Sequence, residues 1–162
     1  MHDLSLYLLE LLENSVRAEA GRVEIGLVVD DTGDELRLTV DDDGRGLSAP
    51  ADRVLDPFYT TKTDKKTGLG LSLLRADAQA AGGDLVVGPS PTLGGTRVEA
   101  YMRNTHIDRI PLGDVGDTLS VTAFTNPEIR FWVSLTGDRF DPPLLRATPA
   151  AAAERLTKVR TI

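Results

Sequence analysis

The chain has 162 residues and a formal net charge of −7, and 41% of its residues are hydrophobic. This length suffices for a domain with a hydrophobic core, and the acidic balance argues against a surface built for nucleic acid or anionic membranes. With no cysteine and two histidines, disulfides, thiolate-bound metals and a histidine-rich metal centre are excluded. No apolar run is long enough to span a bilayer, and the N-terminus lacks a signal-peptide pattern, so we expect a cytoplasmic protein.

The first segment has the pattern of an amphipathic helix. Apolar residues recur at helical spacing from Leu4 to Ala18, so one face is expected to pack on the core. Glu10 and Asn14 are four residues apart and therefore share a face. The amide oxygen of Asn14 can ligate a hard cation such as Mg²⁺, and the Glu10 carboxylate can orient a water molecule. The alternative is that both residues belong to an ordinary hydrated face of the helix.

Two segments after this helix alternate between apolar and polar residues, which is typical of half-buried strands. The first runs from Val23 to Val29 and the second from Leu36 to Val40. The turn-forming residues 30–34 between them predict a hairpin, so we expect the sheet to be antiparallel here.

Three adjacent aspartates and two glycines follow the second strand, in the run Asp41-Asp42-Asp43-Gly44-Arg45-Gly46. The Asp42 carboxylate can accept a hydrogen bond from an exocyclic amine, while Gly44 and Gly46 allow the backbone to pass close to a flat ring. An ordinary solvated acidic turn is the alternative.

The next segment has the features of a phosphate site. Ser48 is a candidate N-cap for a short helix up to Leu55. Three lysines and several hydroxyl residues then precede Gly68-x-Gly70, and Gly70 is expected to open a helix. Glycines at a helix start suit a phosphate, since free N–H groups and the helix dipole face the anion. A flexible basic loop before a helix is the alternative.

The chain from residue 82 onward predicts the remaining elements. Gly82-Gly83 should end the helix that Gly70 opens. Thr96 either places its hydroxyl in the candidate binding site or is an ordinary strand residue. The elements expected are strands over 84–88 and 96–103, a helix over 113–124, a strand over 129–135 with a hairpin partner over 140–145, and a closing helix over 150–157.

The order of these motifs resembles that of the GHKL ATP-binding domain, which DNA gyrase, heat-shock chaperones of that superfamily, MutL-type mismatch-repair proteins and sensor histidine kinases share. The motifs are Glu-x-x-x-Asn on a helix, a strand that ends in Asp-x-Gly-x-Gly, Pro-Phe-Tyr-Thr-Thr-Lys, Gly-x-Gly opening a helix, and Gly-Gly-Thr entering a strand. Their order and spacing together are more specific than any one of them.

The resemblance implies a two-layer α/β sandwich of the Bergerat type (an α+β arrangement), with helices on one face of a mixed, mainly antiparallel sheet. It covers roughly residues 4–103. We therefore expect an ATP-binding domain over residues 1–103 and a small C-terminal α/β extension over residues 104–162, which packs on that domain or docks a partner.

Carried over by position, Asn14 corresponds to the magnesium ligand and Asp42 to the aspartate that reads adenine. Thr96 corresponds to the threonine that helps this aspartate through water, and residues 60–67 to a short lid with lysines available to phosphates. The full set that the resemblance assigns to ATP and Mg²⁺ is Asn14, Asp42, Gly44, Gly46, Phe58, Thr61, Lys62, Lys66, Gly68, Leu69, Gly70 and Thr96.

Glu10 occupies the place of the general base that activates water in the hydrolysing branches of the superfamily. Hydrolysis requires that this carboxylate lie within hydrogen-bond reach of the water. The alternative is that Glu10 holds Mg²⁺ through a water molecule, as the equivalent position does in kinases.

The sequence departs from the family pattern in two features. Lys66 stands where sensor kinases usually have the first glycine of a three-glycine box, which places a cation near the phosphates. No dimerising helical hairpin precedes the domain, so we expect the usual phosphoacceptor module to be absent.

The run from His106 to Leu112 resembles a histidine-kinase H-box, although its acidic residue lies two positions after the histidine rather than one. The alternative is that this run is a structured linker.

The whole chain resembles small stand-alone GHKL proteins associated with iron-only hydrogenase gene clusters, which suggests a regulatory or assembly partner. The sequence supports two functions. The first is a Mg-ATP-binding regulator of kinase-like or ATPase type, with residues 104–162 docking an unidentified hydrogenase-related or signalling protein. The second is a nucleotide sensor in which ATP closes the lid and changes partner affinity without turnover. Neither nucleic acid nor a membrane is an expected partner.

Overall fold

The computed structural model describes residues 2–47, 50–56 and 65–158. These residues form five helices and six strands, namely α1 (Leu4–Arg17), β1 (Arg22–Asp30), β2 (Glu35–Asp42), α2 (Ala51–Val54), α3 (Lys65–Ala80), β3 (Asp84–Pro89), β4 (Thr96–Met102), α4 (Val115–Thr125), β5 (Arg130–Thr136), β6 (Leu144–Ala147) and α5 (Pro149–Thr157). Within this described part, no helix is long and apolar enough to cross a membrane.

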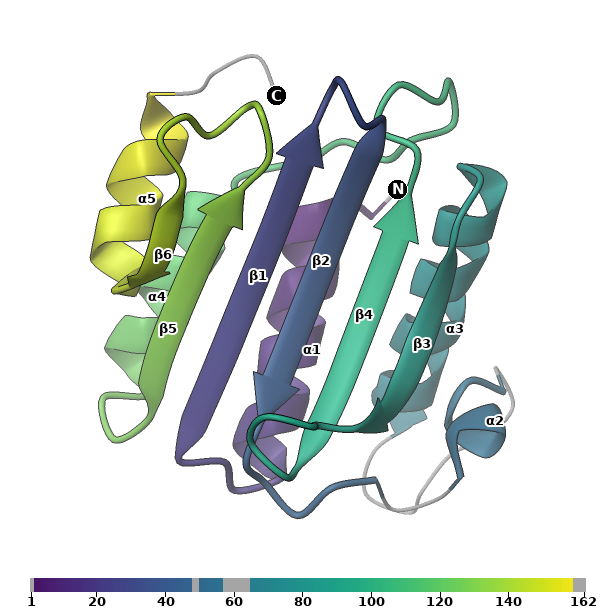
Figure 1. Ribbon diagram of the computed structural model, residues 1–162. Coiled ribbons are helices and arrows are strands. Elements are labelled where there is room, and N and C mark those ends of the chain that lie inside the picture. Colours follow the sequence, from purple (N-terminus) through teal and green to yellow (C-terminus); the bar gives the residue numbers. More distant parts are fainter. Residues whose placement is uncertain (1, 48–49, 57–64, 159–162) are drawn as a thin grey trace.

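All six strands belong to one sheet, in the order β3-β4-β2-β1-β5-β6. Neighbouring strands pair antiparallel except β1 and β5, which run parallel. Helices α1, α3, α4 and α5 lie behind the sheet in the view of Figure 1, so one face of the sheet is covered and the other is open. The expected two-layer sandwich with a mixed, mainly antiparallel sheet is confirmed.

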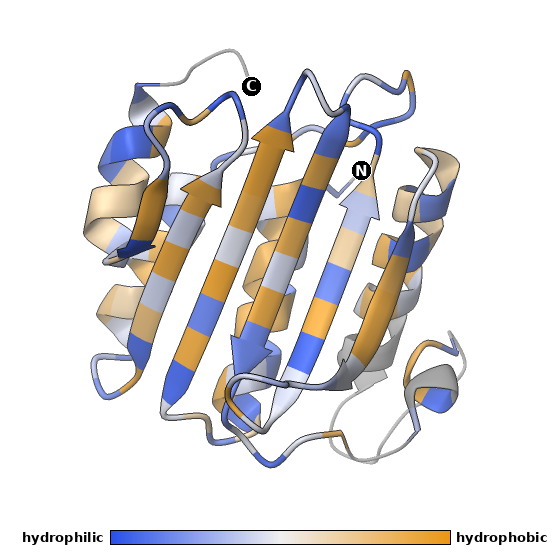
Figure 2. Ribbon diagram, viewed as in Figure 1, coloured by the Kyte–Doolittle hydropathy of each residue, from blue (hydrophilic) through white to orange (hydrophobic). Residues whose placement is uncertain are grey.

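Helix α1 crosses the centre of the covered face (Figure 1). Its apolar stripe is almost fully buried, with Leu8 and Leu12 both at 0% exposure. Beneath it, alternate residues of β1 such as Val23 and Leu27 are buried, while the residues between them are not. Figure 2 shows the same alternation along the strands. The core therefore forms where the helical stripe meets the buried face of the strands.

The segment between β4 and α4 caps the N-terminus of α1. The N–H groups of Leu4 and Ser5 donate to the carbonyl oxygens of Pro111 and Leu112, both at 2.9 Å. Gly113 comes next with φ of +68°, and a Cβ at this position would overlap the Asp3 carboxylate. These contacts satisfy N–H groups that have no partner within the helix. The segment that resembles an H-box thus serves as a structured linker in this fold.

Residues beyond this linker extend the same sheet. Strand β5 pairs with β1 from Arg22 opposite Arg130 to Val28 opposite Thr136. Helix α4 begins at Val115 rather than at residue 113, because Asp114 is its N-cap. The hairpin partner expected over 140–145 is displaced to β6 (Leu144–Ala147), since the two prolines at positions 142 and 143 cannot donate to a strand ladder.

Two aspartates tie the turn between β1 and β2 to distant segments. Asp34 accepts hydrogen bonds from the N–H and hydroxyl of Thr105 at 2.8 and 2.7 Å. These bonds, with a further one from Arg103, lower the pKa of Asp34 to about 2. Asp138 accepts from the hydroxyl and N–H of Thr32, at 2.6 and 2.8 Å. Together with the N–H of Asp31, these donors lower the pKa of Asp138 to about 2.

We predict that the protein loses stability on acidification between about pH 4 and pH 2. An aspartate in an unfolded chain has a pKa of about 3.9, so in this range the unfolded state takes up protons that the folded state does not. The stabilisation from Asp34 and Asp138 is complete above about pH 4 and is lost as the pH falls toward 2. Urea denaturation at several pH values should show this loss, with a shallower slope in the double variant D34N/D138N. Equal slopes in the variant and the wild type would contradict the prediction.

Candidate functional site

The end of β2 places Asp42 at the centre of a cluster of hydrogen bonds. The side chain is 5% exposed. Its Oδ2 accepts from the Ser15 hydroxyl at 2.7 Å, and its Oδ1 accepts from the N–H groups of Gly44 at 3.0 Å and Thr96 at 3.1 Å. These donors come from α1, from the loop after β2 and from β4. They fix the carboxylate in one orientation.

The other two aspartates of the run have different environments. Asp41 bonds to the guanidinium of Arg97 at 2.8 and 3.1 Å and to the Ser90 hydroxyl at 2.7 Å. Asp43 accepts from the N–H groups of Gly21 and Arg22 at 2.7 and 2.9 Å. Successive side chains of a strand point to opposite faces. The alternation of β2 therefore gives Asp42, and not its neighbours, the place beside α1.

Two glycines are required by the close approach of backbone segments around Asp42. A Cβ at Gly44 would lie 2.7 Å from the carbonyl oxygen of Ala18. A Cβ at Gly95 would lie 2.5 Å from Asp42 Oδ1 and 2.6 Å from the Gly44 nitrogen. Gly46 has φ of +87° and no neighbouring atom within 4 Å of such a Cβ. Contact of Gly44 and Gly46 with a bound ring stays a prediction.

Thr96 and Ser15 show what sequence reasoning finds and misses at Asp42. The sequence assigns the Thr96 hydroxyl to the site, whereas the structure uses its backbone N–H; the role of the hydroxyl stays a prediction. Sequence reasoning misses Ser15, although this residue is 1% exposed and donates to Asp42. One signal for it exists: a serine lies on the apolar stripe of α1, four residues after Leu11, where the pattern calls for an apolar side chain.

The side chain of Glu10, a residue of α1, lies against Gly70 of α3. Its Oε1 is 3.4 Å from Nε2 of His2. Its Oε2 is buried and has no hydrogen-bond partner in the described part of the chain. A Cβ at Gly70 would overlap this oxygen, so the glycine leaves the space that the carboxylate occupies.

Tyr7 of α1 also contacts α3. The Tyr7 hydroxyl donates to Asp77 Oδ2 on α3 at 2.5 Å. Burial, followed by this hydrogen bond, raises the pKa of Tyr7 well above its ordinary value. A neutral tyrosine that bridges the two helices is therefore retained across the physiological pH range.

The expectation that Gly70 opens a helix is wrong, because α3 begins at Lys65. Glycine weakens a helix by only about 1 kcal/mol relative to alanine. The packing of Leu71 and Leu74 on the core therefore allows the helix to extend toward its N-terminus through Gly68 and Gly70. The N–H groups without a helical partner are those of the first four residues. Lys66 and Gly68 are among these residues, whereas Leu69 and Gly70 lie beyond them.

Several predicted residues lie outside the described part of the chain. These are Ser48, Phe58, Thr61 and Lys62, together with residues 60–64 of the expected lid. Residues 65–67, also assigned to the lid, are part of α3.

Asn14 lies one turn beyond Glu10 on α1 and is partly exposed. Its Oδ1 accepts a hydrogen bond from Arg17 Nη1 at 3.1 Å. Among the described residues, no group of three or more acidic or histidine side chains could hold a metal. Mg²⁺ in phosphate-binding sites commonly takes one or two protein oxygens and completes its shell with phosphates and water. A single amide oxygen at this position fits a metal that arrives with a nucleotide.

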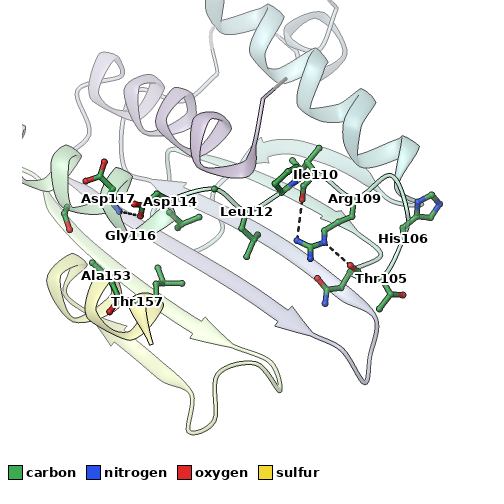
Figure 3. Close-up of a pocket in the computed structure, with 16 residues that line it drawn as sticks. Thr105, His106, Arg109, Ile110, Leu112, Asp114, Gly116, Asp117, Ala153 and Thr157 are labelled. Atoms are coloured by element: carbon green, nitrogen blue, oxygen red, sulfur yellow. Dashed lines mark hydrogen bonds between the residues drawn. The ribbon is translucent and has the colours of Figure 1, made fainter. Parts of the chain in front are cut away.

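A separate hollow of about 1040 Å³ lies between the linker, α4 and the last turn of α5. Figure 3 shows His106 at one end of it and Asp114 and Asp117 at the other. The Arg109 guanidinium donates to the carbonyl oxygens of Asn104 and Ile110 at 2.9 and 3.4 Å. Burial lowers the pKa of Arg109, and the nearby positive charge of Arg139 adds to this effect. Of the residues that the sequence marks as chemically active, this hollow contains His106 alone.

His106 and Asp42 lie at opposite ends of the sheet. Asp41 pairs with Arg97 at the start of β4, whereas Met102 at the end of β4 pairs with Leu36 at the start of β2. The linker that carries His106 leaves from the latter end (Figure 1). The two motifs therefore do not share a site within one chain.

Comparison with known proteins shows the family to which this sequence is related. The profile of the family described as "Histidine kinase-, DNA gyrase B-, and HSP90-like ATPase" matches residues 2–106. The chain is 35% identical over 99 residues to the sensor histidine kinase CpxA of Escherichia coli strain K12, and 30% identical over 94 residues to ZraS of the same strain. Each match covers 57% of this chain but 21% and 20% of the relative, so the chain spans about a fifth of the length of these curated relatives.

A solved structure has a similar fold. The crystal structure of the N-terminal domain of a DNA repair protein aligns with a TM-score of 0.55 and 17% identity, over 99% of this chain and 57% of that chain. The family profile covers more than half of the sequence, including α1, the Asp42 loop and α3. The chain therefore belongs to the family of histidine kinase-, DNA gyrase B- and HSP90-like ATPases.

Proposed function

We propose that this chain binds ATP with Mg²⁺ and hydrolyses it, and that this turnover regulates a partner protein. The observation that carries the proposal is the state of Glu10. Its carboxylate lies one helical turn from Asn14, and one of its oxygens is buried without a hydrogen-bond partner in the described residues. A general base must keep an acceptor atom for the proton that it takes.

Adenine recognition is assigned to Asp42. The carboxylate is fixed by Ser15 and by two backbone N–H groups. Each carboxylate oxygen has two acceptor sites, so Asp42 retains the capacity to accept from the exocyclic amine of adenine. A preoriented charged acceptor favours adenine over a base that presents a carbonyl oxygen at this position.

The phosphates are assigned to the start of α3. The N–H groups of Lys66 and Gly68 belong to the first turn, which has no helical acceptors for them. Asn14 Oδ1 would hold Mg²⁺, which supplies charge neutralisation for the phosphates when bound. The rest of the chemistry belongs to Glu10.

The proposed hydrolytic step is a direct attack of water on the γ-phosphorus. Glu10 takes one proton from the water, whose oxygen forms a bond to phosphorus. The bond from phosphorus to the β,γ-bridging oxygen breaks, and ADP and inorganic phosphate leave. The proton then passes from Glu10 to the phosphate or to solvent.

Transfer of the phosphoryl group to His106 of the same chain is disfavoured by distance. A Cβ at Gly82, just after α3, would lie 3.8 Å from His106 Cδ2, whereas the assigned phosphate site is at the opposite end of this helix. The helix has 16 residues, which corresponds to about 24 Å at 1.5 Å per residue. We therefore favour water over His106 as the acceptor.

The partner is proposed to be a signalling or assembly protein. The support is that CpxA and ZraS are named as sensor histidine kinases, and that the similarity covers about a fifth of each. An ATP-binding unit of this kind commonly acts through another module, because nucleotide binding biases a conformational equilibrium that the second module senses.

We predict that Asp42→Asn weakens ATP binding by about 10- to 100-fold. Asparagine offers a single acceptor oxygen, which the N–H groups of Gly44 and Thr96 already use, and presents an NH₂ group to the amine of adenine. Titration calorimetry with Mg-ATP measures the effect, and Asp43→Asn provides the control because Asp43 accepts only from Gly21 and Arg22 among the hydrogen bonds described. Unchanged affinity in Asp42→Asn would remove the adenine assignment.

We predict that Glu10→Gln retains ATP binding but lowers phosphate release by about 100-fold or more, because glutamine cannot accept the proton. The assay follows γ-labelled ATP with Mg²⁺, and Glu13→Gln on the same helix is the matched control. Persistent release of labelled phosphate by Glu10→Gln would show that Glu10 is not the base. If the label stays on ATP in the wild type although ATP binds, the proposal of hydrolysis is wrong, and the result favours a nucleotide sensor or a kinase that lacks its substrate protein.

A further inference from the structure

Asp41 lies at the end of β2, beside Asp42 but on the opposite face of the strand. Its side chain is buried, and it pairs with Arg97, the residue directly opposite on β4. Nε and Nη2 of Arg97 donate to its two oxygens at 2.8 and 3.1 Å, and the Ser90 hydroxyl donates to Oδ1 at 2.7 Å. Ser90 directly follows β3. The Asp41 carboxylate therefore joins β2 to both sides of the segment between β3 and β4.

This segment, residues 90–95, is a turn that folds around Ser90. The Ser90 hydroxyl accepts from the N–H of Leu93 at 3.0 Å, and the Ser90 N–H donates to the carbonyl oxygen of Gly95 at 3.0 Å. The Ser90 side chain is 4% exposed. Asp41 thus holds the turn through the residue on which the turn is built.

The end of the same turn reaches Asp42 on the other face of β2. The N–H of Gly95 donates to the Asp42 carbonyl oxygen at 3.0 Å, and the N–H of Thr96 donates to Asp42 Oδ1 at 3.1 Å. A Cβ at Gly95 would lie 2.5 Å from Oδ1, so only a glycine allows the turn to approach so closely. The position of the turn therefore decides whether Thr96 reaches the carboxylate.

We propose that Asp41 is a positioning residue for adenine recognition. It holds the turn of residues 90–95 so that the N–H of Thr96 stays on Asp42 Oδ1, which keeps the remaining acceptor sites of Asp42 aimed at the exocyclic amine. The inference rests on the proposed function and adds to it a residue that acts through Asp42 rather than through contact with the base.

The physical argument rests on the geometry of the ion pair. A guanidinium that donates to both oxygens of a carboxylate fixes its direction as well as its distance, so Arg97 prevents the rotation of Asp41. Without this carboxylate, the buried Ser90 hydroxyl loses its acceptor and the turn is no longer held from this face. Asp42 then loses the donor from Thr96 and is free to rotate. Its preference for an amine over a carbonyl oxygen falls as a result.

The test compares the affinities for Mg-ATP and for Mg-bound inosine triphosphate, in which a carbonyl oxygen replaces the exocyclic amine. Titration calorimetry is done on the full chain, at a temperature where thermal unfolding shows that each variant is folded. We expect Asp41→Ala to weaken ATP binding about 5- to 10-fold and inosine triphosphate binding by less than about twofold. Arg97→Ala should lower the ratio of the two affinities in the same direction. Asp41→Asn should retain most of the ratio, because its amide oxygen can still accept from Ser90.

Glu99→Gln is the matched control. Glu99 lies two residues after Arg97 on the same face of β4 and pairs with Arg37 of β2 at 3.1 Å, so this variant also removes an ion pair between the two strands. Among the described residues, Glu99 has no hydrogen bond to the turn of residues 90–95. The ratio of affinities should therefore equal that of the wild type.

The outcomes separate this inference from the function on which it rests. Equal losses for the two nucleotides in Asp41→Ala, or the same change of ratio in Glu99→Gln, would show that Asp41 only stabilises the sheet. A ratio in Asp41→Asn as low as in Asp41→Ala would also overturn the positioning role. If Asp42→Asn weakens ATP binding while Asp41→Ala leaves the ratio unchanged, the role of Asp41 is wrong and the adenine assignment stands. If the wild type binds both nucleotides equally, the adenine assignment fails, and this inference fails with it.

Discussion

The hydrogen bond from Ser15 Oγ to Asp42 Oδ2 is the interaction on which the site depends. It is 2.7 Å long and joins side chains that are 1% and 5% exposed. A carboxylate can be buried in charged form only where donors replace the water it loses. Ser15 supplies one donor from α1, while the N–H groups of Gly44 and Thr96 supply two from the sheet side. The packing of α1 on the sheet therefore brings Ser15 to the carboxylate that it helps to hold.

Helix α1 is fixed at its other end by the Asp3 side chain, which accepts from the N–H of Leu6, and by backbone groups. The carbonyl oxygens of Pro111 and Leu112 accept from its first N–H groups, and Gly113 turns with positive φ against Asp3. This linker joins α1 to α4 and to the strands that extend the sheet. Because both ends of α1 are held, Glu10 and Asn14 in its middle have a fixed position relative to the sheet. The linker that resembles an H-box thus contributes to the candidate site by holding α1, the helix that carries Glu10 and Asn14.

Features that depend on periodicity could be predicted from the sequence, whereas features that depend on approach in space could not. Alternation indicates β1 and β2 and, through the same period, the separation of Asp42 from Asp41 and Asp43. The predicted start of α3 is wrong because tertiary packing overrides the weak preference of glycine against helix. The cap on α1 uses carbonyl oxygens, which every residue has and which leave no signature in a sequence.

Gly70 links local stability to the chemistry proposed for Glu10. An alanine there would strengthen α3 by about 1 kcal/mol on propensity alone, but its Cβ would overlap Oε2. The helix thus forgoes intrinsic stability at the one turn that faces the carboxylate. The unpartnered state of Oε2 among the described residues is a second cost in the same place. The two unfavourable features, a glycine within a helix and a buried oxygen without a donor in the described part of the chain, meet at one atom. They are expected where an acceptor must stay free for a reacting molecule, as in sites where stability is exchanged for activity.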